Sequence, residues 1–171
     1  TKAATLAVVK YLRDKGITSS IKWPNDIYAR DKKMCGMLVE NTLEGGNIAY
    51  SVVGIGLNVN QKDFPPQLVN PVSMAVLTGD HYELDVEMEI LAADLADSFR
   101  RLLAGGDISA ADQEYESSLY RKGSFHEYST NPDGELIEGK IVGVTSGGLL
   151  CLEDKKGELR KFAFKEISYI I

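Results

Sequence analysis

Residues 34–59 read MCGMLVENTLEGGNIAYSVVGIGLNV, and this stretch decides the fold of the first part of the chain. Two apolar runs, Met34–Glu40 and Ile48–Val59, flank the turn-forming sequence Glu44–Asn47, which contains two glycines. Apolar runs rich in β-branched residues on either side of such a turn are typical of two antiparallel strands. The stretch therefore predicts a β-hairpin.

The residues before this hairpin predict a helix and a short strand. Apolar residues recur at helical spacing over residues 3–15, and Gly16 follows them, as glycine often does at the end of a helix. A short strand at residues 21–23 comes next, and the sequence Pro24-Asn25-Asp26 should break it.

The residues after the hairpin predict helices. Residues 61–71 are proline-rich and should be irregular, and a short helix over residues 73–77 should end at Gly79. A long helix, capped by Asp85 and ending at Gly105-Gly106, should follow. We expect its apolar stripe to lie in the core; the stripe consists of Met88, Leu91, Leu95, Phe99 and Leu102.

The pattern changes from helical to strand-like near residues 121–123. Ser109 with Asp112 resembles a capping box that opens a helix to about Tyr120. Beyond Gly123, strand-like segments at residues 139–144, 149–153, 158–164 and 167–171 alternate with turns. We therefore place a domain boundary here, with one domain over 1–122 and a small β domain over 123–171.

Composition restricts the chemistry that the chain can perform. The 171 residues are 44% hydrophobic and 26% charged, as in a compact domain, and no run approaches the roughly 20 apolar residues of a membrane span. Cys35 and Cys151 have no metal-ligand spacing, and His81 and His126 are the only histidines. The sequence therefore predicts free, buried thiols in a reducing cytoplasm and a site built from lysine, carboxylate, amide and backbone groups.

Charge is distributed unevenly along the chain. Residues 1–60 carry eight Lys or Arg against five carboxylates, a net charge of +3, although the whole chain has a net charge of −6. A positive segment on an acidic protein favours a small anionic ligand over DNA, which the remaining surface would repel. Scattered, solvated charges would give the same counts.

Polar groups cluster in Lys22-Trp23-Pro24-Asn25-Asp26-Ile27-Tyr28, which could also be an ordinary turn. Lys33, taken alone, could be a lysine that faces solvent. However, Lys33 begins the strand that follows the Asn25-Asp26 turn, so all three side chains can converge at one end of a sheet. A cation, an amide and a carboxylate together are suited to phosphate chemistry.

Two glycines, Gly54 and Gly56, interrupt the second strand of the hairpin. Glycine weakens a strand interior, so the pair indicates either a β-bulge or the close approach of a ligand or another backbone. The segment lacks the third glycine and the following helix of a dinucleotide-binding motif, which makes it weak evidence for phosphate binding by itself.

Three motifs occur in a fixed order along the chain: Lys22-Trp-Pro-Asn-Asp-Ile-Tyr28, Lys33-x-x-Gly36-x-Leu38-x-Glu40 and Gly54-x-Gly-x-Asn58. Their ordered combination resembles the central catalytic domain of biotin protein ligases. The resemblance implies an α+β fold, in which a mixed sheet with helices on one face forms part of a class II synthetase-like catalytic domain. It also implies that residues 123–171 form a small SH3-like β-barrel that packs against the ligand-bearing sheet.

The resemblance implies a two-step reaction in which ATP and biotin give biotinyl-5'-AMP and a lysine of a biotin carboxyl carrier protein then takes the biotin. It makes Lys33 the catalytic residue and Asp26 the ligand of Mg²⁺, with Lys22 supporting the turn electrostatically. The implied contacts to biotin or the adenylate come from Lys33, Asn25, Gly36, Gly54, Gly56, Leu57 and Asn58. A cytoplasmic homodimer is a further expectation.

The resemblance also indicates what this chain does not include. The family's glycine- and arginine-rich adenylate loop and a DNA-binding domain have no counterpart in these residues, and residues 168–171 offer no arginine to approach the nucleotide. We therefore expect the 171 residues alone not to form the adenylate. Two other functions remain open: a non-catalytic regulatory or dimerisation module of the same fold, and a lipoate or octanoyl acyltransferase.

Overall fold

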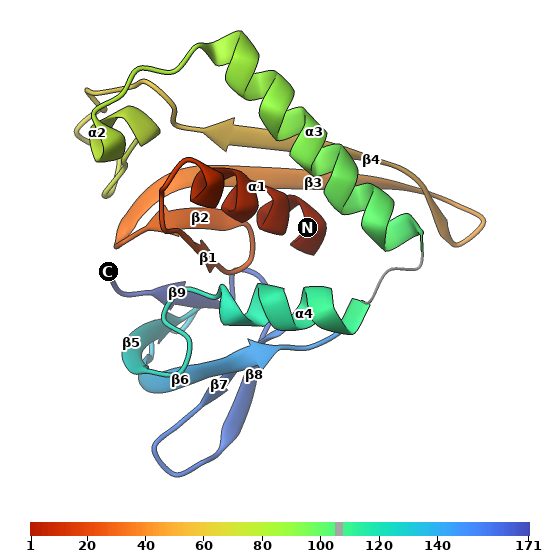
Figure 1. Ribbon diagram of the computed structural model, residues 1–171. Helices are drawn as coiled ribbons and strands as arrows, with labels where there is room; N and C mark the ends of the chain where they lie inside the picture. The colour runs from red at the N-terminus through yellow and green to blue at the C-terminus, as the bar shows by residue number, and fades with distance from the viewer. Residues whose placement is uncertain (105–107) are drawn as a thin grey trace.

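The computed structural model describes residues 1–104 and 108–171, which form an α+β protein with two antiparallel sheets (Figure 1). The N-terminal unit contains a four-stranded sheet in the order β1-β2-β3-β4, and the C-terminal unit a five-stranded sheet in the order β8-β7-β6-β5-β9. Within the described residues, no helix is long and apolar enough to cross a membrane. The expected α+β class is confirmed.

The predicted hairpin forms, and it is the longest feature of the first sheet. Strand β3 (Lys32–Glu44) pairs with β4 (Asn47–Leu57), and β1 (Ser20–Lys22) and β2 (Asp26–Ala29) complete the sheet. Every pair of these strands is antiparallel, and among the described residues parallel pairing occurs only at isolated bridges. The prediction of a mixed sheet was therefore wrong, because neighbouring strands of this sheet all run antiparallel.

Strand β2 is a second difference from the sequence analysis, which placed Asp26 in a turn and predicted no strand over residues 26–29. The turn is shorter, because Lys22 pairs with Asp26 and Tyr28 pairs with Ser20. Three of the four residues of β2 are buried. Burial against the helices thus overrides the local turn signal of Asn25-Asp26 and extends the chain immediately after it.

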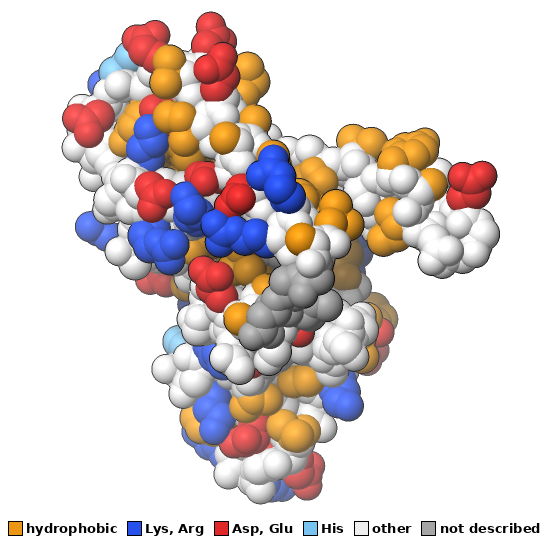
Figure 2. All heavy atoms as spheres, turned by 45° about the vertical axis from the view of Figure 1, so that its right-hand side comes forward, with side chains coloured by type: hydrophobic (Ala, Val, Ile, Leu, Met, Phe, Trp, Pro, Cys, Tyr) orange, Lys and Arg blue, Asp and Glu red, His pale blue; other side chains and the backbone are white. Residues whose placement is uncertain are grey.

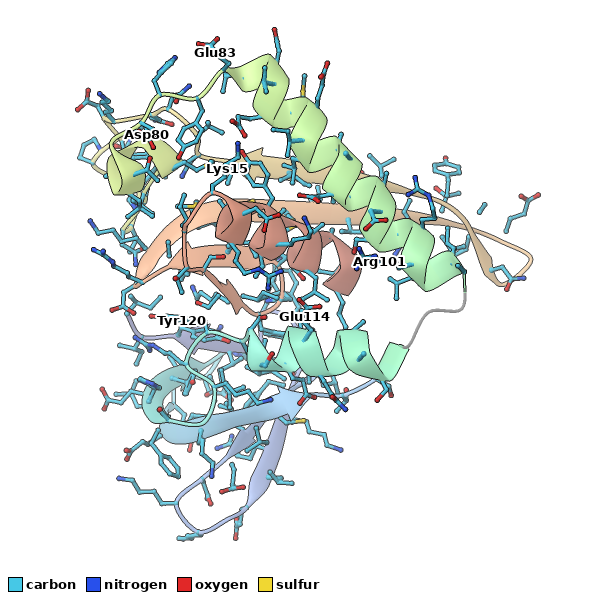
Figure 3. All side chains as sticks on the ribbon, viewed as in Figure 1. Lys15, Asp80, Glu83, Arg101, Glu114 and Tyr120 are labelled. Atoms are coloured by element: carbon cyan, nitrogen blue, oxygen red, sulfur yellow. The ribbon has the colours of Figure 1, made fainter. Side chains whose placement is uncertain are left out.

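Helices α1 (Lys2–Asp14) and α3 (Leu84–Leu103) pack together over one face of this sheet (Figure 1). Glu87 of α3 is buried and accepts hydrogen bonds from Tyr11 Oη and Lys15 Nζ, both at 2.7 Å. Lys15 lies at the end of α1, on the side facing α3 (Figure 3). This buried, fully paired carboxylate joins the two helices.

The short helix α2 (Met74–Thr78) ends at the predicted glycine. Its N-cap Ser73 accepts a hydrogen bond from the backbone nitrogen of Val76, and Gly79 ends it at φ 84°. For α3 the cap prediction was wrong, because Glu83 is the N-cap and Asp85 lies in the first turn. Met88 is 65% exposed rather than buried, whereas Leu91, Leu95 and Phe99 pack against the core. Gly105 and Gly106, the expected helix end, lie outside the described residues.

Helix α4 (Ile108–Ser117) leads to the C-terminal unit. It already includes Ser109, so the predicted capping box is not the start of this helix. The C-terminal strands are β5 (Phe125–Thr130), β6 (Leu136–Val144), β7 (Leu150–Glu153), β8 (Leu159–Phe162) and β9 (Ile167–Tyr169). The sequence analysis missed β5, because its sequence FHEYST does not alternate between apolar and polar residues. The five strands are consistent with the predicted SH3-like barrel.

The two units are joined by contacts on both sides of the expected boundary. Lys122, just before the boundary, bridges to Ile141 of β6, and the backbone nitrogen of Gly123, just after it, donates to the carbonyl of the same Ile141. The indole nitrogen of Trp23 donates to the carbonyl of Gly148 at 3.1 Å. Buried apolar side chains of both units belong to one cluster. The C-terminal unit is therefore held against the end of the first sheet that carries the Trp23 turn.

The other end of the β3–β4 hairpin projects away from the body (Figure 2). Apolar side chains on this arm are largely exposed, among them Leu43 at 65%, Ile48 at 61% and Tyr50 at 61%. An exposed apolar arm of this kind commonly marks a surface that meets another polypeptide.

Candidate active site

A cleft of about 1210 Å³ lies between the two units. One side, here called the N-terminal wall, is formed by residues 22–26, 28, 33–38, 54, 56, 58 and 68–71. The opposite side, the C-terminal wall, is formed by Asn131, Phe164, Lys165, Ile167, Ser168, Tyr169 and Ile171. The cleft thus gathers most of the residues that the sequence motifs single out.

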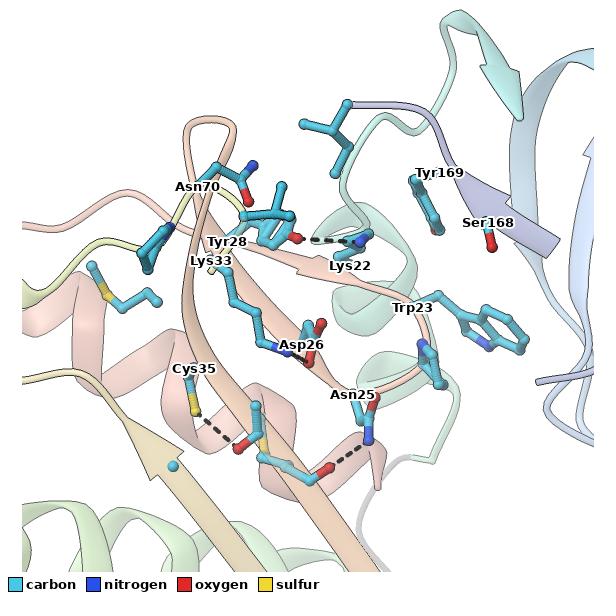
Figure 4. Close-up of a pocket in the computed structure, with 18 of the residues that line it drawn as sticks. Lys22, Trp23, Asn25, Asp26, Tyr28, Lys33, Cys35, Asn70, Ser168 and Tyr169 are labelled. Carbon is cyan, nitrogen blue, oxygen red and sulfur yellow. Dashed lines mark hydrogen bonds and ion pairs between the residues drawn. The ribbon is translucent and has the colours of Figure 1, made fainter. Parts of the chain in front are cut away.

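Lys33 and Asp26 meet in this cleft as an ion pair (Figure 4). The Lys33 Nζ lies 2.7 Å from Asp26 Oδ1, and the lysine side chain is 43% exposed. Gly36 allows this arrangement, because a Cβ there would lie 3.3 Å from both Asp26 Oδ1 and Lys33 Nζ. Lys33 and Asp26 therefore lie together, as predicted, and Gly36 lies next to both side chains.

The backbone fixes Lys33 from the loop side. Its nitrogen donates to the Asn70 carbonyl and its carbonyl accepts from the Val72 nitrogen, both at 2.9 Å. Asn70 in turn donates from its side-chain amide to the carbonyl of Asp31. The loop over residues 68–71, which the sequence predicted only as irregular, therefore lies beside the strand that presents Lys33. This is a pre-organised position for a cation.

Asn25 and Asn58 line the cleft, and their amides already bond to the protein. Asn25 Nδ2 donates to the Met37 carbonyl, and Asn58 Nδ2 donates to the Val72 carbonyl at 3.1 Å. These bonds fasten the turn and the end of β4 to their neighbours. A contact from either residue to the adenylate stays a prediction.

Gly54 and Gly56 form an open floor of the cleft. Both pair regularly with β3, opposite Leu38 and Gly36, and the shift in register lies at Thr42 and Leu43 instead. The β-bulge interpretation was therefore wrong. A Cβ at Gly56 would meet Gly36 O at 3.7 Å, and one at Gly54 would meet Leu38 O at 3.8 Å, which are ordinary contacts. Packing within the protein does not demand glycine here, so the empty space is available to a ligand.

Leu57 differs from the other predicted site residues. It is absent from the cleft lining and packs, partly buried, against the core. Because side chains alternate along a strand, Gly56 and Asn58 face the cleft and Leu57 faces the opposite side. Any contact of Leu57 with a ligand would have to come from its backbone.

Lys22 occupies the junction between the two walls. Its Nζ lies 3.2 Å from Tyr28 Oη, 4.9 Å from the centre of the Tyr28 ring and 5.1 Å from the centre of the Tyr169 ring (Figure 4). Burial lowers the pKa of this lysine; nearby Asp26 opposes the shift, and Lys33 and Arg121 add to it. Sequence analysis gave Lys22 only a supporting role in the turn.

The cleft residues that sequence reasoning missed lie mainly on the C-terminal wall. Phe164, Lys165, Ser168 and Tyr169 are more than 90 residues from the nearest motif residue, so no local pattern joins them to it. One signal was available: Phe164 and Lys165 follow the last turn-flanked strand, where loops commonly carry binding groups.

The two thiols are poorly suited to act as nucleophiles here. Burial raises the pKa of Cys35 to about 12, so its thiol stays protonated at neutral pH and is a poor nucleophile. Cys151 is free and half-buried. No group of three potential metal ligands occurs among residues 1–104 and 108–171. Asp26 alone could contribute one ligand to Mg²⁺, which takes most of its ligands from water and phosphate.

Comparisons with known proteins agree with this geometry. Residues 2–58 match the model of the Biotin/lipoate A/B protein ligase family. The chain is 29% identical over 161 residues to the Bifunctional ligase/repressor BirA of Bacillus subtilis, covering 92% of this chain and 49% of that protein. It is 34% identical over 83 residues to the BirA of Escherichia coli, covering 48% of this chain and 25% of that protein. The chain thus spans about half the length, or less, of these curated relatives.

Solved structures show the same fold. The apo structure of biotin protein ligase from Aquifex aeolicus matches with a TM-score of 0.78 and 23% identity, covering 99% of this chain and 73% of that one. The complex of that ligase with biotin and ATP matches with a TM-score of 0.77 and 24% identity, covering 98% and 68%. The family model over residues 2–58, the curated relatives and the shared fold all indicate similarity to biotin protein ligases.

Proposed function

We propose that this chain carries the adenylate-forming site of an ATP-dependent biotin protein ligase. The observation that carries the proposal is the Lys33–Asp26 pair above the floor made by Gly36, Gly54 and Gly56. This arrangement places a fixed cation beside empty space that a ligand can enter. It matches the requirement of a reaction that brings two anions together.

In the first step, a carboxylate oxygen of biotin attacks the α-phosphorus of ATP. The bond from that phosphorus to the bridging oxygen breaks, and pyrophosphate leaves with the electron pair. Lys33 would contact both the carboxylate and the α-phosphate, offsetting their repulsion and holding them in line. Asp26, 2.7 Å from the ammonium, would keep Lys33 oriented until the anions arrive.

In the second step, the neutral amine of a lysine on a biotin carboxyl carrier protein attacks the acyl carbon of biotinyl-5'-AMP. The bond from this carbon to the phosphate oxygen breaks, AMP leaves, and the amine loses a proton. Lys33 would stabilise the charge that develops on the departing phosphate. The C-terminal wall, opposite Lys33, is the surface that we assign to receiving ATP or the carrier protein.

Asp26 is the residue that we assign to Mg²⁺. A single carboxylate suits this ion, because Mg²⁺ in nucleotide sites is held by one or two carboxylates together with phosphate oxygens. The ion would neutralise phosphate charge. We place the reaction in the cytoplasm, where Cys35 and Cys151 would remain reduced.

Biotin-dependent exchange of labelled pyrophosphate into ATP tests the first step. We expect exchange with the full polypeptide that the gene encodes, and none or very little with the 171 residues alone, because biotin's ureido ring needs an enclosing pocket. Calorimetric titration with biotin gives the second measurement. Submicromolar binding by the 171 residues would contradict this expectation, and no exchange by the full polypeptide would contradict the ligase.

A lipoate or octanoyl transferase is the alternative closest in chemistry, and the matching family model covers lipoate as well as biotin ligases. The same exchange assay with lipoate and octanoate in place of biotin separates the two. Exchange that depends on lipoate and not on biotin would favour the alternative.

A dimerisation module is the other alternative, and the exposed apolar arm of β3 and β4 favours it. Leu43, Tyr50 and Val52 are each more than half exposed on this arm. We propose that the ligase also forms a homodimer through this sheet. Sedimentation equilibrium tests it; a monomer at all concentrations would contradict dimerisation, and a dimer without exchange activity would favour the module.

A further inference from the structure

Lys22 differs from the other lysine of the N-terminal wall in how its charge is balanced. Lys33 lies 2.7 Å from the carboxylate of Asp26. Lys22, within the described residues, makes no ion pair; its polar contact is with Tyr28 Oη at 3.2 Å. A half-buried ammonium without a carboxylate partner can form an ion pair with an anionic ligand.

The surroundings of Lys22 strengthen this capacity. The charged side chains in the cleft lining are Lys22, Lys33, Lys165 and Asp26, so cations outnumber carboxylates in a chain whose net charge is −6. Burial lowers the pKa of Lys22, and Lys33 and Arg121 lower it further against the opposing effect of Asp26. An incoming anion would relieve the cost of keeping this ammonium charged.

The two tyrosine rings hold the ammonium in place between the walls. Tyr28 belongs to β2 and Tyr169 to β9, and their ring centres lie 4.9 and 5.1 Å from Lys22 Nζ. Cation–π contacts orient an ammonium without neutralising its charge. Lys22 is therefore positioned by both units and still available to a ligand.

We propose that Lys22 is a second phosphate-binding cation of the cleft and contacts the pyrophosphate part of ATP, while Lys33 acts at the α-phosphate. This inference rests on the proposed adenylate-forming function and names a further residue of the same site. The chemical reason is charge: a triphosphate carries more negative charge than one lysine, already paired with Asp26, can balance.

Fluorescence of Trp23 offers a direct test with the 171-residue chain and inorganic pyrophosphate. Trp23 is the only tryptophan and lines the cleft. Lys22→Met should weaken pyrophosphate binding about tenfold to a hundredfold, because a hydrogen bond to a charged group contributes about 1.5–3 kcal/mol. Lys22→Arg should restore most of the affinity. Thermal melting of each variant shows whether it remains folded.

Lys2→Met is the matched control. Lys2 also lies over a tyrosine ring, 5.3 Å from the centre of Tyr115, but it pairs with Asp112 and is absent from the cleft lining. It should bind pyrophosphate as the unchanged chain does. Equal loss in Lys2→Met and Lys22→Met would show a general charge effect and overturn the proposal.

Three further results would also overturn it. They are no detectable binding of pyrophosphate by the unchanged chain up to about 10 mM, unchanged affinity in folded Lys22→Met, and failure of Lys22→Arg to recover affinity while folded. The test does not depend on biotin. Lys22-dependent pyrophosphate binding without biotin-dependent exchange in the full polypeptide would therefore contradict the ligase and leave the phosphate site standing.

Discussion

The two walls of the cleft differ in how they are encoded. Most of the N-terminal wall comes from residues 22–58, where three short motifs lie close together in sequence and on adjacent strands. The C-terminal wall comes from residues 131–171, on the other side of three intervening helices. The first wall has recognisable motifs because neighbouring strands bring its polar residues together locally, whereas the second exists only once the two units pack.

Lys33→Ala is the strongest test of the N-terminal wall. Losing the cation that would contact both reacting anions should reduce the rate of pyrophosphate exchange by the full polypeptide about 10²- to 10³-fold. Stability should change little, because the side chain is 43% exposed and its ion pair with Asp26 contributes modestly. Exchange kinetics and thermal melting are the two measurements.

Lys32→Ala is the control for that substitution. Lys32 is the preceding residue of the same strand, is exposed, and does not line the cleft. It should leave exchange unchanged. Near-normal exchange in Lys33→Ala, or equal losses in both variants, would remove Lys33 from its proposed role.

A pair of glycine substitutions separates ligand space from backbone conformation. Gly56→Ala adds a methyl group with ordinary contacts, 3.7 Å from Gly36 O, but extends it into the cleft. We expect unchanged melting and about tenfold weaker binding of the adenylate by the full polypeptide, because the methyl group occupies ligand space. Tight binding with the methyl group present would show that no ligand lies on this floor.

Gly79→Ala should lower stability and leave ligand binding unchanged, the reverse of what we expect for Gly56→Ala. Gly79 ends α2 at φ 84°, and an added Cβ meets no atom within 4 Å. The cost is therefore conformational, about 1–2 kcal/mol, and should appear as a lower melting temperature with unchanged ligand affinity. If Gly79→Ala weakened binding as much as Gly56→Ala, the distinction between floor and turn would fail.

Features that depend on neighbouring residues could be predicted from the sequence, and features that depend on distant elements could not. Gly79 was identified as the end of a helix because such an end depends on neighbouring residues, and Lys33 with Asp26 was identified because one turn separates them. Strand β2 and the exposure of Met88 were missed, because burial by distant elements decides both. Tyr169 was missed as a cleft residue because its partner, Lys22, is 147 residues away.

Trp23→Phe tests how firmly the walls are joined. It removes the hydrogen bond from the indole nitrogen to the Gly148 carbonyl while retaining an aromatic ring. We expect a loss of about 1 kcal/mol, or a melting temperature lower by about 2–4 °C, and a few-fold rise in KM for ATP in the full polypeptide.

Tyr50→Phe is the control for Trp23→Phe, since Tyr50 is 61% exposed on the projecting arm. It should change neither measurement. A lower melting temperature in Trp23→Phe with unchanged KM would show that the hydrogen bond stabilises the fold without shaping the cleft.

Glu87→Gln should have the smallest effect on the cleft, because Glu87 joins α1 to α3 away from both walls. Burial raises the pKa of Glu87, but the hydrogen bonds from Lys15 and Tyr11 outweigh it and the pKa is lowered overall. The stabilising effect of the ionised Glu87 is therefore fully present above about pH 4.3, the pKa of an unfolded glutamate, and is lost as the pH falls through the lower pKa of the folded state.

Glu87→Gln should thus be less stable than the unchanged chain near pH 7, and the difference in stability should shrink below a pH of about 4. Urea unfolding across this range gives the measurement, with exposed Glu89→Gln of the same helix as control. A stability difference that stayed constant from neutral to acidic pH would show that packing, and not the Glu87 charge, holds the two helices together.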